Sequence, residues 1–231
     1  MGDPTLCADY PNLAKWINIC EYSVSEVTII MIGTLLWVVA YYFIIRNAFR
    51  NKYIEMPVIV ATANLAWEFA WSWCFETNMG ELFLWGFRLW FFMDLFIFWN
   101  VLKHGHKQVT TPQLAKYFKP ITVGMLLGWF ALFYFFIKQG LDTPIGATSA
   151  YLITVCMASL YVTTFLSSGE NKKYYSLVAA WCKGVGNSFM TTFVFMAYPE
   201  NYWLQVMTVI CLLYTSPSPR DGATSRMPSS A

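Results

Sequence analysis

Long apolar stretches separated by short polar connections run through most of the chain. Each is close to the length of about 20 residues that an α-helix needs to cross a bilayer. The stretches cover residues 25–46, 56–75, 81–102, 120–138, 145–167, 175–198 and from 202 onward. The pattern predicts an all-α integral membrane protein, a seven-transmembrane helix bundle with no internal repeat and no second domain.

The segment before the first stretch is mixed and polar, unlike a cleavable signal peptide. The helix that begins near Ser25 is therefore expected to serve as signal and anchor together. This divides the chain into a polar N-terminal segment over residues 1–24, a membrane domain over residues 25–213 and a tail over residues 214–231.

Lysine and arginine residues alternate between the connections, and this pattern indicates an orientation. Cytoplasmic loops of membrane proteins carry the excess of these residues. Connections one, three and five between the predicted helices hold nine of them, and the opposite side holds two, Lys15 and Lys138. The distribution predicts an odd number of crossings with the N-terminus outside or lumenal.

The last apolar stretch differs from the others. Residues 201–214 are shorter than a full span, and they are followed by TSPSPRDGATSRMPSSA, in which Pro217 and Pro219 exclude a continuing helix. We interpret the seventh helix as truncated near residues 211–213, with residues 214–231 a non-native or disordered tail. The alternative is a genuine short C-terminus that follows a tilted half-span.

Composition supports a membrane protein and argues against several other classes. Hydrophobic residues make up 57% of the chain and charged residues 12%, against roughly 25% charged in soluble domains. The net charge of +2 and the lack of a basic run argue against nucleic-acid binding. No cysteine–histidine spacing typical of a zinc site occurs. Cys7 and Cys20 are expected to form a disulfide only if their segment faces an oxidising compartment.

Four ionisable residues lie within the predicted spans: Glu68, Arg88, Asp94 and Lys183. Charges inside a membrane are costly, and they mark functional sites or pair with each other. The rise of ~1.5 Å per helical residue places Glu68 at a depth similar to Arg88, and Asp94 similar to Lys183. The alternative to a functional role is two buried ion pairs that fix helix register.

Glu68 has surroundings that suggest chemistry. Asn64 lies one helical turn before it and Trp71 three residues after it, close to the same helix face. A carboxyl desolvated in this way favours its protonated form and can act as a general acid. A nearby Arg88 would oppose this by favouring the carboxylate.

Tryptophans are unusually frequent, with 11 in 231 residues. Aromatic faces stabilise cations, by about 2 kcal/mol or more when desolvated. For some, such as Trp37 and Trp203, a simple role as interfacial anchors is one interpretation. Others fall well inside their spans: Trp67, Trp71, Trp90 and Trp181. A protonated acid among such rings suits chemistry through a carbocation, although aromatic residues also simply fill space between membrane helices.

Four motifs, in order, resemble those of a known family. They are NLAWE at 64–68, LWFFMD at 89–94, KGVGNS at 183–188, with lysine where the family has arginine, and YPENY at 198–202. Together they resemble the fungal transmembrane terpene cyclases of meroterpenoid and indole-diterpene (paxilline-type) biosynthesis. The resemblance covers roughly residues 25–210, and the seven-helix plan of that family agrees with the apolar stretches.

The resemblance implies a lyase- or isomerase-type enzyme that protonates the terminal epoxide of a polyprenyl chain, without metal or cofactor. It implies Glu68 as the catalytic acid and a second acid, an aspartate, in the seventh helix, for which Asp221 in the tail is not an acceptable substitute. The partners would be the lipid bilayer and a hydrophobic prenylated small molecule, and the endoplasmic reticulum the location in a eukaryote. Residues expected around the substrate are Asn64, Trp67, Trp71, Arg88, Trp90, Asp94, Lys183 and Asn187.

Two other functions are compatible with the pattern. A non-enzymatic receptor or transporter is the first. A retinal protein would need a lysine in its seventh helix, and residues 202–214 have none. A PQ-loop sugar carrier would have Pro-Gln inside a helix, but here Pro112-Gln113 lies in a loop. Gly184 and Gly186 are the only hint of the broken helices that transporters often have. The second is a family member that kept the fold and lost the chemistry.

Overall fold

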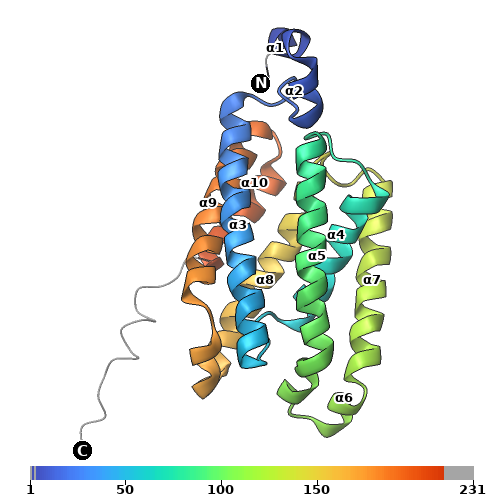
Figure 1. The fold of residues 1–231 in the computed structure, drawn as a ribbon, viewed down its shortest axis with the longest axis vertical. Coiled ribbons are helices and arrows are strands. Elements are labelled where there is room, and N and C mark those ends of the chain that lie inside the picture. Colours follow the sequence, from blue (N-terminus) through green and yellow to red (C-terminus); the bar gives the residue numbers. More distant parts are fainter. Residues whose placement is uncertain (1, 3, 216–231) are drawn as a thin grey trace, which may run out of the picture.

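The computed structural model describes residue 2 and residues 4–215, and this part of the chain is helical, without a strand. The upright helices lie side by side, with α1 and α2 at one end of the bundle and α6 at the other (Figure 1). The elements are α1 (Pro4–Asp9), α2 (Pro11–Trp16), α3 (Val24–Asn51), α4 (Val58–Phe69), the π-helical turn η1 (Ala70–Cys74), α5 (Glu81–His104), η2 (Gly105–Gln108), α6 (Pro112–Lys116), α7 (Phe118–Lys138), α8 (Ala147–Ser167), η3 (Gly169–Tyr174), α9 (Leu177–Ala197) and α10 (Tyr202–Thr215).

Several helices have the length and composition of membrane spans. Four meet both criteria over Val24–Asn51, Glu81–Gln108, Phe118–Lys138 and Ala147–Ser167, and Tyr202–Tyr214 is a shorter apolar helix. The outer surface is apolar as well. Along α5, for example, Trp85, Phe92, Phe96 and Trp99 are exposed. An apolar exterior of this kind is suited to lipid, and the protein is a multi-pass membrane protein.

Each apolar stretch of the sequence contains a helix, with shifted boundaries. The second stretch changes at Ala70 from α-helix to a π-helical turn, in which the Phe75 N–H donates to the Ala70 carbonyl at 3.0 Å. The last described helix covers Tyr202–Thr215. The remaining predictions about the tail fall on residues 216–231, outside the described part.

Helices α3 and α9 run next to each other (Figure 1), and two glycines set how closely they approach. A Cβ added at Gly33 would lie 3.1 Å from the Gly186 carbonyl oxygen, and one at Gly186 would lie 2.5 Å from the Trp37 ring. Small residues at helix crossings allow such close contact in membrane proteins. The Gly186 backbone thereby forms the surface against which the Trp37 indole rests.

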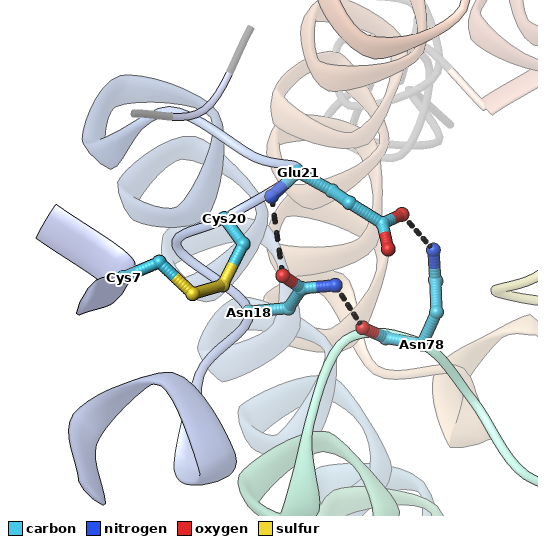
Figure 2. Close-up of a disulfide and its surroundings, with 5 residues drawn as sticks. All are labelled: Cys7, Asn18, Cys20, Glu21 and Asn78. Carbon is cyan, nitrogen blue, oxygen red and sulfur yellow. Dashed lines mark hydrogen bonds between the residues drawn. A yellow bond between two sulfur atoms is a disulfide. The ribbon is translucent and has the colours of Figure 1, made fainter. Parts of the chain in front are cut away.

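The N-terminal segment is fastened across the end of the bundle that carries α1 and α2 (Figure 2). Cys7 and Cys20 form a disulfide. The Asn18 amide donates to the Asn78 carbonyl oxygen at 2.6 Å, and the Asn78 amide donates to Glu21 Oε2 at 2.7 Å. The two hydrogen bonds connect the N-terminal segment to the α4–α5 loop, and the disulfide closes a loop within that segment.

At the opposite end, Glu55 is buried in the α3–α4 connection. Its Oε2 accepts hydrogen bonds from the Tyr161 hydroxyl at 2.8 Å and from the Ser176 backbone N–H at 2.9 Å. Its Oε1 has no hydrogen-bond partner among the described residues. Burial raises the pKa of Glu55 to about 7, although these hydrogen bonds and the charge of Lys183 act in the opposite direction. Glu55 therefore joins α8 and α9 to the connection in a pH-dependent way.

Replacing Glu55 by glutamine is expected to flatten the dependence of stability on pH. The ordinary pKa of 4.5 applies to the unfolded chain, so the folded state binds this proton more tightly. Stability from this group is therefore greatest below about pH 4.5 and falls by roughly 3 kcal/mol as the pH rises to about 7. Between these pH values, the Tm of detergent-solubilised wild type should fall more than that of Glu55→Gln. Glu170→Gln, in exposed η3, serves as the control, and parallel curves for wild type and Glu55→Gln would contradict the prediction.

Candidate functional site

A cavity of about 130 Å³ lies between α3, α4, α5, α8 and α9. Most of its wall is aromatic and aliphatic, and Met79 and Ile145 close it from the loops at the end near α1 and α2. Its volume is close to that of a ~150 Å³ apolar cavity that accepts benzene. The polar side chains in the wall are Thr34, Tyr41, Asn64, Glu68, Tyr151 and Thr154.

Helix α4 contributes the central part of the wall. Asn64 lies three residues before Trp67 and four before Glu68, and Trp71, in the following turn η1, lies three residues after Glu68, so these side chains lie close to one face. The first three line the cavity, as their sequence motif led us to expect. Trp71 does not. It is buried behind the wall, where its ring lies 6.1 Å from that of Trp67 and 6.4 Å from that of Phe87.

Glu68 is buried, with 7% of its surface exposed. Within the described part of the chain, no hydrogen bond or ion pair reaches it, and its Oε2 is fully enclosed. The ion pair with Arg88, which the sequence left open as an alternative, is not present in the described part of the chain. Arg88 lies next to Phe87, on the neighbouring face of α5, and its guanidinium stacks over the rings of Trp73 and Trp85 at 5.1 and 4.7 Å. Arg88 is therefore not part of the cavity wall.

Asp94 is completely buried beneath the cavity, and neither carboxyl oxygen has a hydrogen-bond partner among the described residues. It is close enough to Glu68 and to Lys183 to interact with both electrostatically. An Asp94–Lys183 ion pair within 4 Å, the other alternative left open by the sequence, is not present in the described part. The Lys183 ammonium instead donates to Met157 Sδ and lies 5.4 Å from the Trp37 ring.

The last expected substrate-site residue, Asn187, is also outside the cavity wall. It is fully buried in α9, and its amide donates to Cys211 Sγ of α10 at 3.3 Å. Asn187 therefore joins the last two helices, and the structure gives it a packing contact there.

Several aromatic rings line the same cavity as Glu68. Trp67 and Phe87 meet edge to face at 5.3 Å and 89°, and Trp90 lies 6.4 Å from Phe87. Trp37, for which an interfacial anchor was one interpretation, lines the cavity and packs against Gly186 of α9. Trp181, which falls inside its span in the sequence, points outward and is 52% exposed.

Tyr41 is a cavity residue that the sequence reasoning missed. Its hydroxyl accepts a hydrogen bond from the Asn64 amide at 2.7 Å, and it interacts electrostatically with both Glu68 and Asp94. The signal was present in α3, where Ile30, Thr34, Trp37 and Tyr41 recur at helical spacing and all line the cavity. An apolar helix with no polar face gave no reason to select that stripe.

The arrangement has a definite chemical capacity. A neutral carboxylic acid can donate a proton to an apolar molecule held in the cavity, and the surrounding aromatic faces can stabilise the resulting positive charge. The described residues contain no group of three or more His, Cys, Asp or Glu side chains that could hold a metal ion.

Comparisons with known proteins find a matching family model and a similar protein. A family model described as Pyr4-like transmembrane terpene cyclases matches residues 18–216. The chain is 25% identical over 191 residues to the Pyr4-family terpene cyclase mfmH of Annulohypoxylon moriforme. The aligned region covers 80% of this chain and 78% of that protein. No solved structure matches the chain.

Gly146 determines how tightly the tryptophans are held, and we expect Gly146→Ala to be strongly destabilising. Its φ is +74°, and a Cβ there would lie 2.6 Å from the Trp71 ring and 2.7 Å from the Trp67 ring. Gly140 has a similar φ of +70° but open space around it. Gly140→Ala should lower the stability of the fold by roughly 1–2 kcal/mol, because of backbone strain alone. Gly146→Ala should lower it by roughly 1–3 kcal/mol more, because the added Cβ overpacks the site. Equal Tm values for the two variants in detergent would contradict this.

Proposed function

Because the chain belongs to the Pyr4-like transmembrane terpene cyclases, we propose that it cyclises a prenylated epoxide by protonation in the cavity beside Glu68. The observation that carries the proposal is a buried carboxyl that faces an aromatic cavity with no cation and no hydrogen-bond donor assigned to it in the described part of the chain. Such a group has the properties of a proton donor rather than of a structural ion pair.

Glu68 supplies the proton that starts the reaction. A carboxylate without a partner is costly in an apolar site, so the neutral acid is the form that the cavity stabilises. The proton moves to the epoxide oxygen, and the C–O bond to the more substituted carbon breaks. The nearest double bond then attacks the carbocation and closes a ring, and loss of a proton ends the cascade. An apolar wall that excludes water protects the cation from capture by water.

The aromatic wall stabilises the cation once it has formed. Trp67, Phe87 and Trp90 lie on the α4 and α5 faces of the cavity, and Trp37 lies on the α3 face. Desolvated aromatic faces contribute about 2 kcal/mol or more each to a cation in contact. Rings on several sides can therefore follow the positive charge as it moves along the chain of the substrate.

The charge of Asp94 favours the protonated form of Glu68. The resemblance implies a second acid in the seventh helix, but α10 as described, Tyr202–Thr215, contains no carboxyl. Asp94 interacts with Glu68, and Lys183 attracts Asp94 but contributes nothing resolved at Glu68. Two nearby carboxyls do not both ionise, and of the two only Asp94 has a resolved attraction to a cation, so Glu68 is the carboxyl that keeps its proton more readily.

In the membrane, we place seven crossings with the N-terminus on the lumenal side, in the endoplasmic reticulum of a eukaryote. The Cys7–Cys20 disulfide supports this because such bonds persist in oxidising compartments. The protein would then take its prenylated substrate from the bilayer. The cavity is smaller than the ~300–1,000 Å³ of typical ligand pockets, so substrate entry requires the surrounding helices to separate.

We expect Glu68→Gln to abolish cyclisation while the protein still folds. Glutamine fills the same space but has no acidic proton, so turnover of a prenyl epoxide should fall by about 10²–10⁴-fold, with an unchanged Tm. The assay measures cyclised product in microsomes against a panel of prenylated epoxides. Glu81→Gln is the control, because Glu81 is partly exposed and pairs with Lys15 at 3.1 Å. A Glu68→Gln variant that cyclises the substrate at the wild-type rate would refute the proposal.

A further inference from the structure

A hydrogen-bond chain connects the cavity wall to the α7–α8 loop. The Trp67 indole N–H donates to Ser149 Oγ at 2.7 Å, and the Ser149 hydroxyl donates in turn to Asp142 Oδ2. Ser149 is 1% exposed, at the start of α8. The chain runs from an aromatic ring that touches the cavity to a carboxyl in a loop outside the spans.

The two oxygens of Asp142 have separate partners. Oδ1 accepts the backbone N–H groups of Thr143, Thr148 and Ser149 at 2.8, 2.9 and 3.3 Å. These bonds begin α8, as an N-terminal cap does. Oδ2 accepts the Ser149 hydroxyl. Helix capping therefore accounts for one oxygen only, and the other oxygen is directed toward Trp67 through Ser149.

Trp67 differs in this respect from the other tryptophans near the cavity. The indole N–H groups of Trp37, Trp71 and Trp90 are buried without a hydrogen-bond partner among the described residues. Those rings have no hydrogen bond that fixes their orientation. Trp67 is held by packing and by a directional bond, and it is also the immediate neighbour of Glu68 in the sequence.

We propose that Asp142, acting through Ser149, is a positioning residue that fixes and polarises the Trp67 ring for cation stabilisation. The inference rests on the proposed cyclase function and adds a specific role to it. A carboxylate at the end of the chain strengthens both hydrogen bonds. Withdrawal of the N–H proton toward Ser149 leaves more electron density on the indole face, which increases its attraction for a cation. The same bond holds the ring edge to face against Phe87.

A double-mutant cycle tests whether Ser149 acts through Trp67. Ser149→Ala removes the acceptor, and Trp67→Phe retains an aromatic ring but has no N–H. Ser149→Ala should lower kcat roughly tenfold with little change in KM, and should increase prematurely terminated products. In the Trp67→Phe background, the same change should have no further effect. Ser149→Thr, which keeps the hydroxyl, should restore the product pattern.

Two further variants separate positioning from general stability. Asp142→Asn keeps the Oδ1 oxygen that caps α8 but removes the charge. It should shift the products in the same direction as Ser149→Ala, and it should lower the Tm less than Asp142→Ala, which removes the capping oxygen as well. Ser159→Ala, also on α8, is the matched control, because Ser159 donates only to the Val155 carbonyl at 2.9 Å. It should leave the products unchanged.

The indole N–H resonance of Trp67 gives a readout that is independent of turnover. Trp67→Phe identifies this resonance in the NMR spectrum of the full chain labelled with ¹⁵N-tryptophan, and it should move in Ser149→Ala and Asp142→Asn. An unmoved resonance, or equal effects of Ser149→Ala on products in both backgrounds, would overturn the positioning role alone. Wild-type protein inactive on every prenyl epoxide would instead overturn the cyclase function, and with it any catalytic role for Asp142, even if the resonance moved.

Discussion

The unpartnered carboxyl of Glu68 is the feature on which the rest of the site depends. A charged carboxylate at this position would cost several kcal/mol in an apolar bundle, so the fold must either provide a cation or keep the group neutral. Arg88 is used elsewhere, in stacking with Trp73 and Trp85. Lys183 acts on Asp94. In the proposed function, this carboxyl is the proton source beside the apolar cavity.

Close helix packing holds the rings around that proton source. The Gly33–Gly186 approach of α3 and α9 leaves space for the Trp37 ring beside Gly186, and Gly146 allows the α7–α8 loop to lie against Trp67 and Trp71. Both contacts need a residue without a side chain, because a Cβ would lie within 3.2 Å of its neighbours in each case. The aromatic wall is therefore built by backbone contacts as much as by the rings themselves.

Helix positions and the α4 face were predictable from the sequence, whereas helix rotation was not. The spacing of Asn64, Trp67 and Glu68 placed them on one face, and they do line the cavity. For Arg88, which does not line the cavity, the reasoning failed, because a lipid-exposed helix is apolar on all sides and periodicity does not show which face turns inward. Contacts between distant segments, such as Trp67 with Ser149, depend on how the loop between α7 and α8 folds back. No local pattern in the sequence records that.

The charge state of Glu68 is the most direct test of the proposed mechanism, because it needs no substrate. Infrared difference spectra of purified wild type and Glu68→Gln at neutral pH would isolate the signal of this one carboxyl. The proposal predicts the carbonyl band of a protonated carboxylic acid that is present in wild type and missing from the variant. A difference spectrum that contains only carboxylate bands would show that Glu68 is ionised, and would contradict its role as the proton donor.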